Sequence, residues 1–218
     1  MMQKSFHIQT WLRRWCLALC VAAVMPLSVQ ASEAEFQRWR QQSELVEARG
    51  DIPQSIRAAL RMHDLKPGDI PTMLALSGLY GKARQPEQQL AWSRRILKLQ
   101  PRHLEALINQ GNAQSVLGDA QAARNSFLMA KAVEPASPLP VYSLGVLAQA
   151  LQHDEEAIGY FEAALKFLPT FEDARFNLAV SQANTGRVRE AVRNLDQLLK
   201  ANPAAQDARE LRNALLNG

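Results

Sequence analysis

After the first thirty-one residues, three histidines and one run of carboxylates are the residues best suited to catalysis or metal binding. His63, His103 and His153 are widely separated in the sequence. Asp154-Glu155-Glu156 offers carboxylate oxygens of the kind that bind a divalent cation. Such a run is also typical of the first turn of a helix, where it complements the helix dipole. We favour the helix start, and we interpret the histidines as exposed residues near helix ends.

No other pattern in the sequence predicts an active site. The glycines do not form a phosphate-binding loop. Both cysteines, Cys16 and Cys20, lie in an N-terminal segment that we expect to be removed. The remaining chain then has no thiol for a disulfide, a thiolate metal site or a nucleophile. We therefore expect no enzyme activity, no catalytic residue, no metal ion and no cofactor.

The first thirty-one residues have the order of a secretory signal peptide. A basic start precedes the uncharged run Trp15–Met25, which is too short to cross a bilayer comfortably. The small residues Val29 and Ala31 then match a signal-peptidase site. We predict a signal peptide at 1–31, cleavage after Ala31, and a periplasmic or secreted location. A leader that stays uncleaved as a membrane tether is the main alternative.

Removing this leader changes the charge balance. The chain has 25 basic and 21 acidic residues. Lys4, Arg13 and Arg14 belong to the leader, which has no acidic residue, so 22 basic residues remain against 21 acidic ones. A protein that binds nucleic acid should keep a basic excess. We therefore expect no nucleic-acid partner.

The rest of the chain has a period of 34 residues. Five prolines mark it: Pro67, Pro101, Pro135, Pro169 and Pro203. Other residues keep the same spacing, namely Gly111 and Gly145, Phe127 and Phe161, and Ala123, Ala157 and Ala191. The prolines would end helices, because proline cannot continue one. The small residues would let two helices approach closely, and the rings would fill the gap beside them.

This pattern resembles the tetratricopeptide repeat. The clearest unit keeps Val141, Leu144-Gly145, Ala157, Phe161, Ala164 and Pro169 of the family's motif. The resemblance implies an all-α fold, a right-handed α-solenoid of about five helix pairs, in a domain at 32–218. The repeats would be 36–69, 70–103, 104–137, 138–171 and 172–205, followed by a capping helix at 206–218. A single pair cannot bury both of its faces, so stacked neighbours must supply the core.

In this family, the first helices of successive repeats line a concave groove that holds a peptide or a partner helix. The resemblance places nine residues at groove-facing positions: Asn109, Asn112, Tyr142, Val146, Gln149, Phe176, Asn177, Val180 and Asn184. Amide side chains can bond a peptide backbone as both donor and acceptor. Tyr142 and Phe176 would add aromatic surfaces. We expect Tyr142, Phe176 and Asn112 to form the centre of the binding surface.

The segment 70–103 is unusually basic and forms a second candidate surface. It contains Lys82, Arg84, Arg94, Arg95, Lys98 and Arg102 against only one acidic residue, Glu87. Such a surface would suit an anionic membrane or an acidic partner. We favour the alternative that it is a solvated surface without a binding role.

The function that follows is that of a non-catalytic adaptor or scaffold. It would bind a peptide or partner protein in its groove, and we expect it to assist the assembly of a cell-envelope complex. The alternatives are a membrane-tethered scaffold and a self-associating structural protein. Membrane contact is expected only with an uncleaved leader, and a homo-oligomer stays open.

Overall fold

The chain is helical throughout the part that the structure describes. The computed structural model describes residues 27–217, so most of the predicted leader, residues 1–26, lies outside the described residues. Helices α2 to α12 account for all regular structure in this range, which contains no strand. The predicted all-α solenoid fold is confirmed. Among the described helices, none combines the length and apolar character needed to cross a membrane.

The described residues form two compact units, one ending at Asp69 and one beginning at Ile70. The first consists of α2 (Leu27–Ala48) and α3 (Ile52–Leu65), which pack together. Lys66 Nζ lies 2.6 Å from Glu33 Oε2 and 4.1 Å from the centroid of the Phe36 ring, so it ties the end of this unit back to α2.

Helix α2 begins nine residues before the first repeat that the sequence predicts. No glycine or proline interrupts the chain between Leu27 and Ala48, so nothing stops the helix from extending to the residue after Pro26. The predicted cleavage point after Ala31 therefore lies inside α2 of the full-length chain. Val29 and Ala31 are both exposed there.

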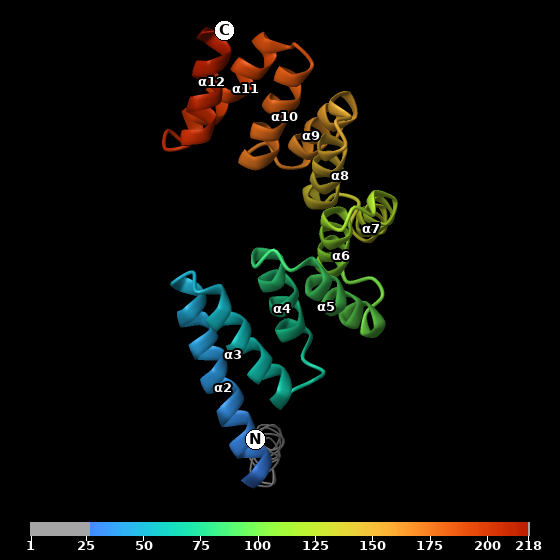
Figure 1. Ribbon diagram of the computed structural model, residues 1–218, viewed down its shortest axis with the longest axis vertical. Coiled ribbons are helices and arrows are strands. Elements are labelled where there is room, and N and C mark those ends of the chain that lie inside the picture. Colours follow the sequence, from blue (N-terminus) through green and yellow to red (C-terminus); the bar gives the residue numbers. More distant parts are fainter. Residues whose placement is uncertain (1–26, 218) are drawn as a thin grey trace, which may run out of the picture. The chain divides into compact units, whose positions relative to one another are not determined.

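The second unit is a series of helical hairpins closed by a single helix (Figure 1). Its helices are α4 (Ile70–Lys82), α5 (Pro86–Leu99), α6 (Leu104–Val116), α7 (Ala120–Val133), α8 (Pro138–Ala150), α9 (Asp154–Phe167), α10 (Glu172–Asn184), α11 (Val188–Ala201) and α12 (Gln206–Asn217). The first helix of each hairpin starts 34 residues after the previous one, and so does the second helix. The period of the sequence is therefore the spacing of the helix starts.

The turn inside each hairpin contains one residue in the left-handed region, again at a spacing of 34. These residues are Gly50 (φ 71°), Arg84 (φ 55°), Gly118 (φ 83°), Gln152 (φ 60°) and Gly186 (φ 77°). Glycine adopts this conformation without strain, which explains its place in three of the turns. Asp119 follows one such glycine and caps α7, because its Oδ1 accepts a hydrogen bond from Ala122 N at 3.0 Å.

Glycines and rings pack within the hairpins as the sequence predicts. A Cβ atom at Gly145 would lie 2.6 Å from Phe161 Cε1, and one at Gly111 would lie 2.4 Å from Phe127 Cε1. Both rings are almost fully buried. The expectation that these small residues let the two helices of a hairpin approach is confirmed.

The hairpin α4–α5 has a polar core where α6–α7 and α8–α9 have glycine and phenylalanine. Ser77 Oγ and Ser93 Oγ are 2.8 Å apart, and Ser93 Oγ donates to the Gln89 carbonyl oxygen at 2.8 Å. All three residues are buried. Hydrogen bonds therefore replace apolar packing at the centre of this hairpin.

Helix α12 covers the end of the last hairpin. Leu211 and Leu215 pack with Ala208 against the buried Leu195 and Leu198. A further leucine of this helix, Leu216, is 56% exposed and takes no part in the cover.

Candidate protein-binding groove

The first helices of the second unit's hairpins line its inner side. Helix α6 contacts both α4 and α8, and α8 contacts α10. The second helices, α5, α7, α9 and α11, pack against their own and the next first helix but are not close neighbours of one another. The side where successive helices approach more closely is the concave side of such a stack. The groove is therefore built on α4, α6, α8 and α10.

The nine residues that the resemblance places in the groove lie on three of these helices. Asn109 and Asn112 are on α6, Tyr142, Val146 and Gln149 are on α8, and Phe176, Asn177, Val180 and Asn184 are on α10. Spacings of three and four residues put Asn109 and Asn112 on one side of α6, and Tyr142, Val146 and Gln149 on one side of α8. On α10, Asn177, Val180 and Asn184 share a side in the same way, and Phe176 is adjacent to Asn177. Asn112, Val146 and Asn184 are exposed, and the other six are half-buried.

Tyr142 is part of the joint between two repeats. Its hydroxyl accepts a hydrogen bond from Asn177 Nδ2 at 2.9 Å. Its ring lies 4.8 Å from that of Phe171 and 5.8 Å from that of Phe161, measured between centroids. Burial raises the pKa of Tyr142, the Asp173 carboxylate raises it further, and the bond from Asn177 lowers it in part. The phenol therefore stays neutral and is engaged by α10.

Two of the amides also join repeats. Gln149 Nε2 donates to Ser181 Oγ at 2.9 Å and to the Asn177 carbonyl oxygen at 3.3 Å. Asn184 Nδ2 lies 3.2 Å from both carboxylate oxygens of Asp154. These donors are already used within the chain. Among the nine residues, Asn112 and Val146 are exposed, and neither side chain forms a hydrogen bond to another described residue.

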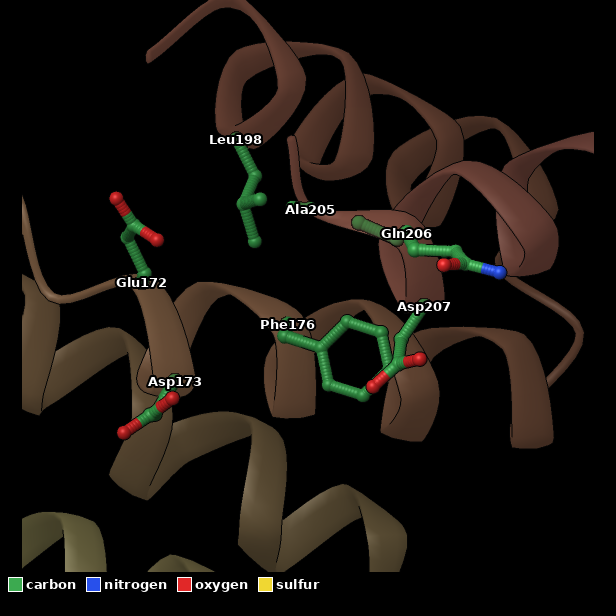
Figure 2. A pocket seen from close by; sticks show the side chains of 8 residues that line it. Glu172, Asp173, Phe176, Leu198, Ala205, Gln206 and Asp207 are labelled. Carbon is green, nitrogen blue, oxygen red and sulfur yellow. The ribbon is translucent and has the colours of Figure 1, made fainter. Parts of the chain in front are cut away.

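Phe176 faces a pocket of about 330 Å³ at the α10–α12 end of the groove (Figure 2). The other lining residues come from the start of α10, the end of α11 and the start of α12: Glu172, Asp173, Leu198, Ala205, Gln206, Asp207 and Ala208. Figure 2 shows the ring between the carboxylates of Asp173 and Asp207. Glu172 accepts from Asn202 Nδ2 at 2.8 Å. The pocket thus combines an aromatic floor with acidic sides.

Some residues of the site were not predicted from the sequence. Leu139 and Val116 are 43% and 71% exposed, and they lie on the same side of α8 and α6 as Tyr142 and Asn112. The sequence does contain a signal for Leu139. The equivalent positions of the two neighbouring repeats, 34 residues before and after it, are the charged residues Glu105 and Asp173, as is typical of an exposed position. The inner side therefore contains more exposed apolar surface than the nine residues alone suggest.

The basic residues of 70–103 do not form one cluster. Arg94, Arg95 and Lys98 lie together on the exposed side of α5. Lys82 ends α4, and Arg84 occupies the turn at the other end of α5. The guanidinium carbon of Arg95 lies 4.3 Å from the centroid of the Trp92 ring. The structure thus brings together Arg94, Arg95 and Lys98 out of the six basic residues of this segment.

The described histidines lie at or near helix ends as expected, but only His153 is exposed, and His63 and His103 are half-buried. His103 is the N-cap of α6, since its Nδ1 accepts from Ala106 N at 3.3 Å. Among the described residues there is no group of three potential ligands that could hold a metal ion.

The carboxylates of 154–156 each face a neighbouring repeat. Asp154 accepts from Asn184, Glu155 pairs with Arg187, and Glu156 Oε1 lies 2.8 Å from Arg124 Nη1. The Arg124 guanidinium lowers the pKa of Glu156. The run therefore joins repeats at the first turn of α9.

Comparison with known proteins agrees with this architecture. The tetratricopeptide repeat family model matches residues 155–215. TTC0263, a tetratricopeptide repeat protein of Thermus thermophilus, has a similar structure with a TM-score of 0.75. The two chains are 19% identical, and the similarity covers 84% of this chain and 100% of that one. Residues 155–215 thus match the tetratricopeptide repeat family, and the chain has the tetratricopeptide repeat fold.

Other similarities lie within the same class of fold. YrrB, described as a tetratricopeptide repeat protein with an unusual peptide-binding site, has a TM-score of 0.55 and is 14% identical, covering 80% of this chain and 90% of YrrB. Protein O-mannosyl-transferase TMTC3 of Homo sapiens is 27% identical over 150 residues, which is 67% of this chain but 16% of that protein. The tetratricopeptide repeat fold typically serves as a scaffold that binds proteins or peptides.

Proposed function

We propose that this protein is a non-catalytic adaptor that holds an extended peptide or a helix of a partner protein along α6, α8 and α10. The observation that carries the proposal is the inner side itself. Exposed apolar and amide side chains lie along this side: Asn112 and Val116 on α6, and Leu139 and Val146 on α8. The Tyr142–Asn177 bond joins α8 to α10. An apolar strip with a few polar groups is typical of a groove that binds a peptide.

The comparisons support this proposal. YrrB has the same fold and is described as having a peptide-binding site. The mannosyl transfer named for TMTC3 is not proposed here, because the matched region is only 16% of that protein. A fold by itself does not fix the partner, so the chemistry of the groove must carry the argument.

We further propose that the adaptor acts in the cell envelope, in the assembly of a larger complex, after export and cleavage behind Ala31. The order of basic, apolar and small residues in 1–31 supports export. N-terminal sequencing of the protein recovered from the envelope checks it. A first residue at Ser32 is expected, and a start at Met1 would favour the tethered scaffold.

The groove is tested by substituting residues that do not join repeats. Asn112→Ala with Val146→Ser removes one free amide and one exposed apolar side chain, and it spares Tyr142 and Gln149. The matched control, Leu128→Ser with Asn213→Ala, makes the same kinds of change at exposed positions on α7 and α12.

Affinity capture from envelope extract with mass spectrometry gives the readout. We expect a protein that the native chain and the control hold and that the groove variant loses. Thermal melts followed by circular dichroism should be alike for all three. Equal capture by the groove variant and the control would refute a binding role for this surface. Capture of nothing but further copies of the chain would favour the self-associating scaffold.

A further inference from the structure

The outer side of α5 has a positive face. Arg94, Arg95 and Lys98 lie on this helix, and Arg102 lies in the turn that follows its last residue, Leu99. The spacing of four residues puts Arg94 and Lys98 on one side of the helix, and Arg95 is adjacent to Arg94. All four are exposed. We call these four residues the α5 basic face.

These cations lack acidic partners. No carboxylate of the described residues forms an ion pair with any of the four, and the acidic residue of α5, Glu87, lies about two turns before Arg94. Three arginines elsewhere in the second unit are paired with carboxylates: Arg124 with Glu156, Arg187 with Glu155 and Arg212 with Asp196. The hairpin α4–α5 contains a single acidic residue, Glu87, so its positive charge is not compensated within the hairpin.

Part of this charge is absent from the same positions of later repeats, although Lys98 corresponds to the lysines Lys166 and Lys200. In the 34-residue register, Arg94 corresponds to Leu128, Glu162 and Asp196. The repeat architecture therefore does not require a cation at this position.

An apolar side chain lies within the same face. Leu99 is 58% exposed and sits between Lys98 and Arg102 in the sequence. From residue 91 to Arg102 the exposed residues are mainly cationic or apolar, and Gln100 carries the single exposed side-chain amide among them. This composition differs from the groove, where asparagine and glutamine predominate. It suits a surface rich in phosphates better than an acidic polypeptide.

The densest acidic run of a second copy would not offer free carboxylates that could pair with the α5 basic face. The densest acidic run of the second unit is 154–156, and its three carboxylates are occupied by Asn184, Arg187 and Arg124 within the same chain. Pairing with another copy would require these contacts to break. The occupant should instead bring its own unpaired negative charge.

We propose that the α5 basic face binds the surface of an anionic phospholipid bilayer. The four cations lie against the lipid phosphates, and Leu99 enters the boundary between headgroups and acyl chains. A cluster of basic residues at the surface is attracted to an anionic bilayer, with each cation near the surface adding to the attraction, and an exposed leucine adds apolar burial. The contact is peripheral and does not require the leader to remain. It lies on α5, away from the inner side, so the groove stays open while the protein rests on the membrane.

The test measures binding of the full chain to phosphatidylglycerol–phosphatidylcholine vesicles and to pure phosphatidylcholine vesicles. The first variant is Arg94→Gln with Lys98→Gln and Arg102→Gln, which spares the Arg95–Trp92 contact. The control, Arg189→Gln with Arg193→Gln and Lys200→Gln, removes the same charge from exposed positions of α11. All forms share the same N-terminal segment, so its contribution to vesicle binding cancels.

We expect binding to the anionic vesicles to weaken roughly a hundredfold in the first variant, about fivefold for each cation lost. The control should stay within about twofold to threefold of the native chain, and added salt should weaken binding because it screens these charges. Leu99→Ser should also weaken binding without altering the salt dependence.

Equal losses in the first variant and the control would overturn the proposal, because the net charge rather than the α5 basic face would then decide binding. Unchanged binding in the first variant would overturn it as well. Binding to polyglutamate through Arg94, Lys98 and Arg102, with none to the anionic vesicles, would replace the membrane by an acidic polypeptide.

Discussion

Tyr142 and Gln149 have two competing roles at the scale of single residues. Both lie on the groove side of α8. However, the Tyr142 hydroxyl accepts a hydrogen bond from Asn177 Nδ2, and Gln149 Nε2 donates one to Ser181 Oγ. A ligand that bonded either group would have to replace a bond between repeats, and a buried polar group left without a partner costs about 1–3 kcal/mol. A ligand can therefore form a polar contact with Asn112 at a lower free-energy cost, because the Asn112 side chain has no hydrogen bond between repeats to replace.

The contact between Gly145 and Phe161 makes a prediction at the same scale. Gly145→Ala would put a methyl group 2.6 Å from Phe161 Cε1. This distance is too short for two carbon atoms, so the ring or the helices α8 and α9 would have to move. We expect a loss of about 1–3 kcal/mol in the free energy of unfolding, as for other overpacked cores. Urea denaturation followed by circular dichroism measures it.

Gly159→Ala in the same hairpin is the control. No atom lies within 4 Å of a Cβ at this exposed position, so the better helix propensity of alanine should stabilise the chain by about 0.5–1 kcal/mol. A loss of similar size in both variants would mean that the Phe161 contact is not what limits residue 145.

The sequence predicted the helices and their contacts better than it predicted individual side-chain partners. The prolines and the glycine–phenylalanine pairs of 138–171 predicted the all-α repeat fold, which is confirmed, because they mark where helices end and touch. The start of α2 at Leu27 was not predicted, since the repeat motif has no residue that requires a helix to begin there. An extension of this kind depends on the absence of a helix breaker rather than on a positive signal.

The side-chain partners of the groove were harder to predict. The register places Tyr142 and Asn177 on neighbouring helices, but it does not say that their side chains bond to each other rather than to a ligand. Likewise, the acidic run 154–156 predicts a helix start without naming Arg124 or Arg187 as partners. These pairings depend on the offset between successive hairpins, which a sequence period does not contain.

The role of α12 as a cap makes a prediction at the element scale. Leu211 packs on the cluster formed by Leu195 and Leu198, so Leu211→Ser should destabilise the chain by about 1–2 kcal/mol through lost apolar burial. Leu216→Ser, on the same helix but 56% exposed, should change stability by less than about 0.5 kcal/mol. Thermal melts compare the two. Equal effects would mean that α12 does not cover the last hairpin through this face.

At the scale of the whole molecule, stability is distributed along a line of neighbours. Each hairpin of the second unit contacts only those next to it, so the free energy of unfolding is close to a sum over hairpins and their interfaces. The hairpin α4–α5 contributes a buried Ser77–Ser93 hydrogen bond where α8–α9 contributes a buried Phe161. A net hydrogen bond is worth about 1 kcal/mol, and a buried aromatic ring is worth more.

Amide hydrogen exchange should therefore be faster in α4 and α5 than in α8 and α9. Local opening costs less where apolar burial is smaller. Helices α10 and α11 serve as the comparison, because they lie towards the other end of the unit but have an apolar core at Ala179, Ala191 and Leu195. If α10–α11 exchanged as fast as α4–α5, fraying of the ends rather than the polar core would explain the rates.

The constant interval between helix starts also bears on how such a chain can change in length. Hairpins α6–α7 and α8–α9 both contain the glycine–phenylalanine contact and meet their neighbours through equivalent positions. An in-frame duplication or loss of 34 codons would thus join surfaces that already fit, wherever in the period the break falls. The groove can then grow or shrink by whole repeats in a single genetic event. A change of any other length would shift every later helix out of phase.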